Sequence, residues 1–173
     1  MPFDEVLEPY FALLGYMTYS YAMLEHGISV AIVAIHHHHG GRAIKKELPR
    51  TQFQRKIEYL RAVAPHIPAI GPNLAGVMNL ADRAEAVAKD RQLFIHGTPT
   101  DFHAEGAVTM NKLDVTKLDN LFEITDRKVT FAELTAIADE ASGLANFALD
   151  FASHMIRDDQ QQLIKHSRGK DPG

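Results

Sequence analysis

The segment DRQLFIHG, at residues 90–97, contains an arginine and a histidine that could together act on a phosphodiester. Arg91 carries a permanent, planar cation whose N–H groups fit phosphate oxygens. Histidine is the residue type that can accept or donate a proton near neutral pH, and His96 supplies one here. These are the groups that cleavage of RNA by its own 2′-hydroxyl would need without a metal ion. Because such cleavage needs both a general base and a general acid, a symmetric dimer would have to supply the second histidine.

Arg91 shares the apolar face of a helix that the sequence predicts from about Leu74 to His96. The apolar positions of this face recur at helical spacing, at Val77, Leu80, Ala84, Val87 and Phe94. A guanidinium here needs a carboxylate partner or an opening onto a cleft or a second subunit, and Glu25 in the first helix is the expected partner. His96 lies about 140° around an ideal helix from Arg91, so the two border one site if the helix unwinds at Gly97.

The same spacing of arginine and histidine occurs a second time, in RAVAPH from Arg61 to His66. There Pro65 directly precedes the histidine and ends the predicted helix. The spacing alone is therefore a weak signal, and the residues around Arg91 and His96 distinguish that copy.

DRQLFIHG resembles the motif of the HEPN superfamily, a group of helical nucleotide-binding domains. In that family an arginine with a polar follower lies a few residues before a histidine; Gln92 is the polar follower here, and residues 93–95 are apolar. The plan from about Phe11 to Ile156 is also similar, with the motif late in one helix and another helix after it. The resemblance implies an all-α, bundle-like homodimer with one composite, metal-independent endoribonuclease site. It also implies RNA as the substrate and, in a toxin–antitoxin setting, an antitoxin partner.

Under this hypothesis Arg91 stabilises the charge that develops on phosphate, and His96 transfers the proton. Gln92 orients the substrate or the histidine, and Glu25 sets the position of Arg91. The alternative hypothesis is a non-catalytic helical dimerisation or adaptor domain. In that case Arg91 pairs with Glu25 or Asp90, and His96 interacts favourably with the negative end of its helix.

Metal binding through histidines is a third hypothesis. Four consecutive histidines, His36–His39, end the first predicted helix, and His96, Asp101 and His103 fall in a predicted short loop. Consecutive side chains point around a helix and rarely complete a tetrahedral shell, and the spacing in the loop matches no metal-binding motif. We therefore assign no metal and no cofactor, and the role of His36–His39 stays open.

Four predicted helices position these residues in a bundle-like domain over residues 1–156. The first runs from about Asp4 to His37 and is apolar nearly all round, as expected of a central helix. The second begins after Thr51 as its N-cap, and residues 65–73 then form a loop. The third is the helix of Arg91.

A β-hairpin over about residues 105–129 is inserted before the last helix. The segments AVTMNKLDV and NLFEITDRKVT alternate and are rich in β-branched residues, which predicts two strands whose role stays open. Thr130 and Glu133 form a capping box that begins the last helix. The chain turns polar after Ile156, so residues 157–173 are predicted to be a frayed tail.

Composition limits the remaining classes of function. The 173 residues include no cysteine, which excludes disulfides and thiolate chemistry and fits a cytoplasmic protein. The acidic N-terminus argues against a signal peptide. Residues 11–35 are apolar, but Glu25 and His26 near their middle would be costly in lipid. We therefore predict a buried helix there and no membrane partner.

The formal net charge of −4 means that nucleic-acid binding would have to use a local basic patch. The segment from Arg42 to Arg61 carries seven cations against two acids, Glu47 and Glu58. It could follow the phosphates of a nucleic acid near the site, or it could be a solvated face balanced by acids elsewhere.

Overall fold

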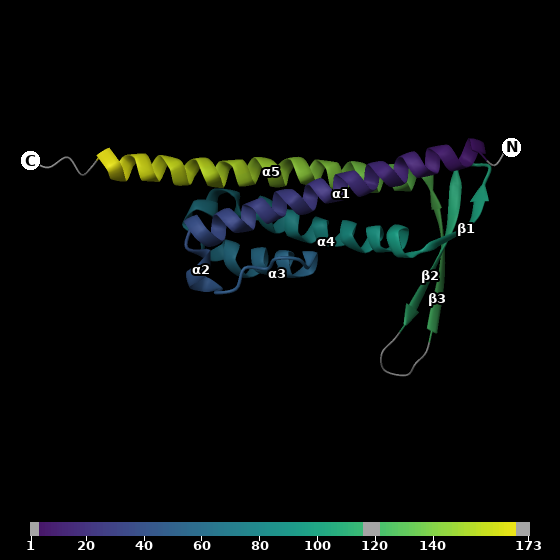
Figure 1. The fold of residues 1–173 in the computed structure, drawn as a ribbon, viewed down its shortest axis with the longest axis horizontal. Helices are drawn as coiled ribbons and strands as arrows, with labels where there is room; N and C mark the ends of the chain where they lie inside the picture. The colour runs from purple at the N-terminus through teal and green to yellow at the C-terminus, as the bar shows by residue number, and fades with distance from the viewer. Residues whose placement is uncertain (1–3, 116–121, 169–173) are drawn as a thin grey trace, which may run out of the picture. The chain divides into compact units, whose positions relative to one another are not determined.

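The computed structural model describes residues 4–115 and 122–168, which are mostly helical with one small antiparallel sheet (Figure 1). The chain divides into two compact units. The sheet unit comprises the chain up to Ala22 together with Ala86–Ser142, and the helical unit comprises Met23–Glu85 and the chain from Gly143 onward. Three long helices contribute residues to both units: α1 (Asp4–His38), α4 (Leu74–His96) and α5 (Phe131–Arg168).

The sheet consists of three antiparallel strands in the order β1-β2-β3: β1 (Thr98–His103), β2 (Ala107–Val115) and β3 (Phe122–Thr130). The predicted hairpin is confirmed, since β2 and β3 are its strands. The prediction of a loop before it is wrong, because residues 98–103 pair with β2 as a third strand. Pro99 lies where the register of this pairing shifts, and the side chains of β1 are mostly exposed. The segment has no alternation of apolar and polar residues, and it contains a proline. The two usual sequence signals of a strand are therefore missing.

The core of the sheet unit joins the sheet to the three long helices. Val108, Met110 and Val129 of the sheet are fully buried. The buried residues that cluster with them come from α1, α4 and α5: Tyr10, Met17, Leu93, Phe94, Leu134 and Ala138. This core fixes the last turns of α4, which carry Arg91 and His96, against the sheet.

The ends of the long helices follow from local sequence signals. α4 has its predicted bounds, and α1 ends just before Gly40, whose φ of 80° favours glycine. α5 begins with the predicted capping box: the Thr130 amide donates to Oε2 of Glu133 at 2.7 Å, and the Glu133 amide donates to Oγ1 of Thr130 at 3.1 Å. The hydrogen bonds from the backbone and hydroxyl of Thr130 hold the pKa of the Glu133 carboxyl below its usual value.

Other boundaries differ from the prediction. α5 continues to Arg168, so the predicted tail is helical from residue 157 to residue 168. The glutamine, leucine and lysine residues of this segment have a high helix propensity. α3 (Phe53–Val63) has Gln52, not Thr51, at its N-cap. The predicted loop at 65–73 contains two short 3-10 helices, Ala64–His66 and Pro68–Asn73, each with a proline in its first two positions. With α2 (Gly41–Ile44), the described residues contain five α-helices and three strands, so the expected all-α fold is mostly-α with a sheet.

The apolar length of α1 is only partly buried. Leu24 and Ile28 are fully buried, whereas Phe11, Tyr19 and Val33 are exposed by 58%, 65% and 43%. No helix within the described ranges is long and apolar enough to cross a membrane.

Candidate functional site

Arg91 lies in the sheet unit, half-buried on α4, and its guanidinium covers the ring of Tyr21 from α1. The guanidinium carbon is 4.5 Å from the ring centroid, which is the geometry of a cation–π interaction. Nε of Arg91 is buried and has no hydrogen-bond partner among the residues that the structure describes. The aromatic ring therefore holds the cation in place without neutralising its charge.

The carboxylates expected to pair with Arg91 have other partners. Glu25, in the helical unit, accepts a hydrogen bond from Nζ of Lys56 at 2.7 Å, and Asp90 forms an ion pair with Arg127 at 3.2 Å. The prediction that Glu25 sets the position of Arg91 is therefore not supported. Glu25 is needed by Lys56, which is buried and requires an opposite charge.

Tyr21 contacts Arg91 in the candidate site, and the sequence analysis did not identify it. It lies one helical turn before Glu25 on α1, is buried, and contacts Arg91 of α4. The sequence signal for Tyr21 is its spacing of four residues from Glu25. An aromatic ring one helical turn from the expected carboxylate can also contact a guanidinium.

His96 is the last residue of α4, and its side chain is exposed. Only Gly97 separates it from β1. The Gly97 amide donates to the carbonyl of Leu93 at 2.8 Å, and an ideal Cβ at Gly97 would collide with that carbonyl oxygen. Such a Cβ would also lie 3.2 Å from Cε of Met110. The absence of a side chain at Gly97 therefore lets the helix end directly against β2 and fixes the backbone of His96.

The residues around His96 leave it open to a ligand or to a second copy of the chain. Gln92 is exposed on the same helix, and Ile95 next to His96 is 38% exposed. α4 is helical through His96, so Arg91 and His96 lie about 7.5 Å apart along the helix axis and about 140° apart around it. The sheet unit therefore presents a cation, a titratable ring and an amide on the last two turns of one helix.

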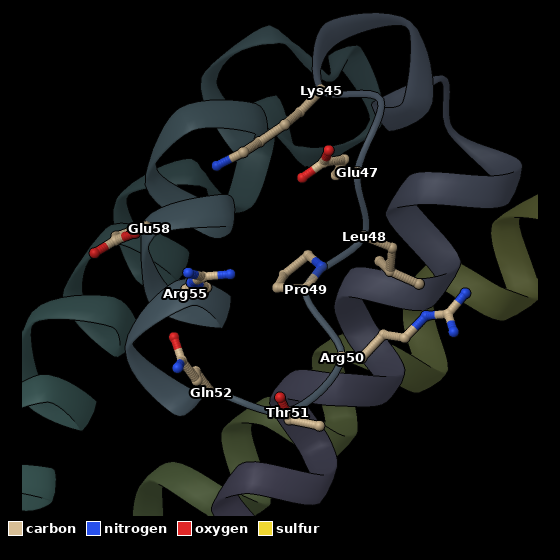
Figure 2. Close-up of a pocket in the computed structure, with 9 residues that line it drawn as sticks. All are labelled: Lys45, Glu47, Leu48, Pro49, Arg50, Thr51, Gln52, Arg55 and Glu58. Atoms are coloured by element: carbon tan, nitrogen blue, oxygen red, sulfur yellow. The ribbon is translucent and has the colours of Figure 1, made fainter.

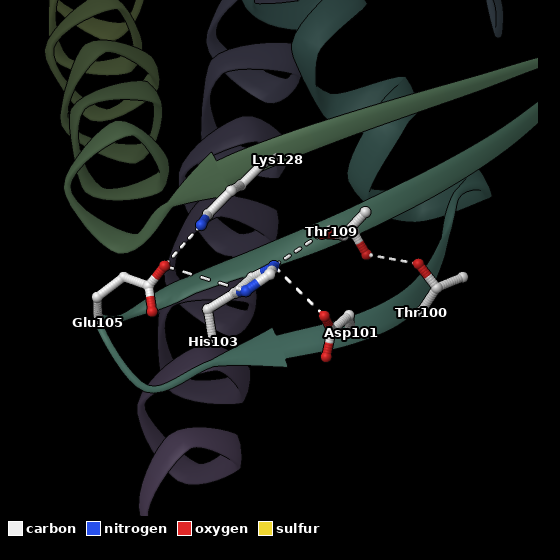
Figure 3. A network of polar contacts seen from close by, with 6 residues as sticks. All are labelled: Thr100, Asp101, His103, Glu105, Thr109 and Lys128. Atoms are coloured by element: carbon white, nitrogen blue, oxygen red, sulfur yellow. Dashed lines mark hydrogen bonds and ion pairs between the residues drawn. The ribbon is translucent and has the colours of Figure 1, made fainter.

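A second polar cluster surrounds His103 on the sheet (Figure 3). Nε2 of His103 is 2.8 Å from Oγ1 of Thr109 and 3.7 Å from Oδ2 of Asp101. Lys128 donates to Oε1 of Glu105 at 2.6 Å, and this hydrogen bond lowers the pKa of the Glu105 carboxyl. Because the members come from all three strands and the β1–β2 turn, the cluster fastens the strands together. Asp101 and His103 thus lie in a strand and not in the predicted loop.

The four consecutive histidines have separate surroundings in the helical unit. His36 is buried with Nδ1 3.0 Å from the Tyr59 hydroxyl, and Nε2 of His39 is 2.8 Å from the carbonyl of Met155. His37 is exposed. Across the described parts of the chain, no three histidine, aspartate or glutamate side chains are grouped so that they could hold a metal ion.

Burial of His36 predicts a dependence of stability on pH. Desolvation, followed by the charges of His37 and Arg42, lowers the pKa of His36 from 6.5, so the unfolded chain binds this proton more readily than the folded chain. The contribution of neutral His36 to the free energy of unfolding is complete above the pKa of His36 in the unfolded chain. It is lost as the pH falls from there through the pKa of His36 in the folded chain. The free energy of unfolding therefore changes with pH by at most the value for one bound proton, about 1.4 kcal/mol per pH unit.

We expect His36→Gln to remove the pH dependence of stability that His36 contributes, while the side-chain amide of the glutamine keeps a hydrogen bond to Tyr59. Urea unfolding at about pH 7.5 and about pH 5.5 would measure it as a smaller loss of stability on acidification than in the wild type. His154→Gln, at an exposed position on α5, is the matched control and should follow the wild type. Equal pH dependence in all three proteins would contradict the assignment to His36.

These contacts define a mostly helical protein with an arginine and a histidine where a helix meets a small sheet. No protein-family model, curated protein or solved structure matches this chain. A function is therefore inferred from the residues and contacts themselves.

Proposed function

We propose that the protein is a HEPN-like homodimeric endoribonuclease that cleaves RNA without a metal ion, using Arg91 and His96 of both copies. The observation that carries this proposal is the state of Arg91. Its cation is held on the Tyr21 ring and forms no ion pair with a carboxylate within the described residues. A cation that is fixed but not neutralised can bind a phosphate oxygen.

The proposed reaction is an attack of the RNA 2′-hydroxyl on the adjacent phosphorus. His96 of one copy accepts the proton of the 2′-hydroxyl while the new P–O2′ bond forms. The P–O5′ bond breaks, and His96 of the second copy donates a proton to the leaving 5′ oxygen. Arg91 stabilises the negative charge on the non-bridging oxygens, and the exposed amide of Gln92 orients the substrate. The products are a 2′,3′-cyclic phosphate and a 5′-hydroxyl.

Exposed apolar side chains of the sheet unit support the proposed dimer. Phe11 and Tyr19 of α1 are more than half exposed, and Ile95 is exposed beside His96. Large apolar side chains of this kind are enriched in the centre of protein interfaces. A second copy that covers them would bring the second His96 to the site. The proposal extends to the fold: α1, α3, α4 and α5 would form the four-helix bundle, with the sheet inserted before α5.

The test uses wild-type protein in excess chelator with single-stranded RNA of mixed sequence. We expect cleavage of RNA and no cleavage of the same sequences made with 2′-O-methyl groups, because methylation removes the nucleophile. Mass spectrometry should find 2′,3′-cyclic phosphate ends. Cleavage of both probes would contradict the mechanism.

The alternative is a dimerisation or adaptor domain that does not cleave RNA, and the exposed apolar residues of α1 favour it equally. A wild-type protein that sediments as a dimer but leaves every RNA intact would support this alternative. An antitoxin partner would then be irrelevant to activity, whereas for the enzyme it would be expected to block cleavage.

A further inference from the structure

The basic segment between Arg42 and Arg61 contains two cations that are used within the fold. Lys56 is buried in its ion pair with Glu25. Arg61 forms ion pairs with Asp82 at 2.7 Å and with Glu85 at 2.8 Å. These two side chains therefore stabilise the helical unit and are not available to a ligand.

The other five cations of the segment have no such partners. Their side chains are exposed, and none forms an ion pair or a hydrogen bond with a residue that the structure describes: Arg42, Lys45, Lys46, Arg50 and Arg55. Five cations against the two nearby carboxylates, Glu47 and Glu58, leave a local charge of +3 in a chain of net charge −4. We name these five residues the basic cluster.

The basic cluster surrounds two adjoining cavities in the helical unit. The first, of about 540 Å³, is lined by Lys45, Arg50 and Arg55 together with the two carboxylates. Figure 2 shows Lys45 and Arg55 extending into the space between α3 and residues 45–52, which connect α2 to α3, whereas Arg50 points away from them. The second cavity, of about 520 Å³, is lined by Arg42, Lys46 and again Arg50. Arg50 thus links the two cavities.

We propose that the basic cluster binds the phosphate backbone of a single-stranded nucleic acid. Cations spread over two linked cavities match several consecutive phosphates better than one isolated anion. The concave shape suits a flexible strand, whose bases are accessible for stacking. His37 lines the second cavity and is exposed, and its ring packs edge-on against His36 at 4.9 Å, so it offers a fixed aromatic surface for a base. The proposal does not rest on cleavage by Arg91 and His96.

The test measures binding with probes that the proposed nuclease reaction cannot cleave. The wild-type chain is titrated into fluorescein-labelled oligonucleotides of about 12 nucleotides, made as 2′-O-methyl RNA and as DNA, and anisotropy is followed over a range of salt concentrations. Arg50→Gln combined with Arg55→Gln removes two cations of the basic cluster. Arg83→Gln combined with Arg157→Gln, on α4 and α5 of the same unit, makes an equal change of net charge and is the control.

We expect the Arg50/Arg55 variant to bind about tenfold more weakly at about 0.1 M salt, and the control variant to bind within about twofold of the wild type. The slope of log K against log salt should fall by about 1.4, because each lost phosphate contact on a single strand contributes about 0.7. A tighter complex with the 2′-O-methyl RNA or with the DNA identifies which nucleic acid is the better source of the phosphates.

Three results would overturn the proposal. The wild type could fail to bind either probe, or the two double variants could weaken binding equally. Alternatively, phosphatidylserine vesicles could bind the wild type and discriminate between the variants while the oligonucleotides do not, which would make the ligand a membrane surface. Because neither probe is cleaved by the proposed chemistry, absence of nuclease activity and absence of this binding site give separate results.

Discussion

Replacing His96 by alanine is expected to lower the rate of RNA cleavage by about 10²- to 10⁴-fold, the usual contribution of a general acid or base. The loss should be at the upper end of this range, because one substitution removes both the acid and the base from the proposed symmetric site. His96 is exposed at the end of α4, so the folded state loses no buried contact. Initial cleavage rates in excess chelator, together with thermal unfolding of the same samples, would measure the effect.

His66→Ala is the matched control for this prediction. His66 has the same spacing from Arg61 that His96 has from Arg91, and it is also exposed. Arg61 is neutralised by Asp82 and Glu85, so this second arginine–histidine pair should contribute nothing to cleavage. Activity that survives in the His96 variant, or that is lost equally in the His66 variant, would contradict the proposed site.

Mixing the two proteins tests whether the site is shared between copies. After subunit exchange between equal amounts of wild type and the His96→Ala variant, about one quarter of the dimers are wild-type homodimers. If a mixed dimer lacks one of the two proton-transfer groups, activity per wild-type chain should fall to about half. Activity that is unaffected by mixing would show that each chain acts alone.

The second large effect is expected at Gly97, where substitution by alanine should lower the free energy of unfolding by about 1–3 kcal/mol. A Cβ at this position would collide with the backbone carbonyl of Leu93, and it would also press on Met110 and on the carbonyl of Asn111, 3.3 Å away. Backbone atoms on two elements cannot move aside as the end of a flexible side chain can. Either the helix end or the sheet must therefore shift.

Urea unfolding of Gly97→Ala beside Gly143→Ala would measure this cost. Gly143 lies within α5, and an ideal Cβ there meets no atom within 4 Å, so alanine should stabilise the protein by up to about 1 kcal/mol. Gly97→Ala should also lose cleavage activity under conditions where it remains folded, because His96 moves with the helix end. Wild-type stability and activity in this variant would show that the junction does not fix the histidine.

Sequence patterns predicted the elements that carry a strong periodic or capping signal. α4 and β2 have their predicted bounds, and the capping box of Thr130 and Glu133 is present. β1 was not predicted, because its residues are polar and exposed and its pairing depends on β2, which follows it in the chain. Its existence is decided by tertiary pairing and not by local preference.

The candidate site shows the same limit. The types of Arg91 and His96 were sufficient to propose a chemistry, but the partner of Arg91 was not predictable from charge alone. Glu25 pairs with Lys56, which is 31 residues away in the sequence, and Tyr21 takes its place beside the arginine. Which of several carboxylates and aromatic rings contacts Arg91 depends on how the helices pack, and the composition of the chain does not specify that packing.

The short passage from α4 to β1 has a consequence for how changes in the sheet should be interpreted. Thr98, the first residue of β1, is paired with Asn111 of β2 and lies two positions after His96. Only Gly97 lies between His96 and Thr98, so no loop separates the imidazole from the paired strand. A shift in the pairing of β1 with β2 therefore moves the imidazole as well. Variation in β1 and β2 is thus variation in the geometry of the site, although no side chain of these strands takes part in the proposed reaction.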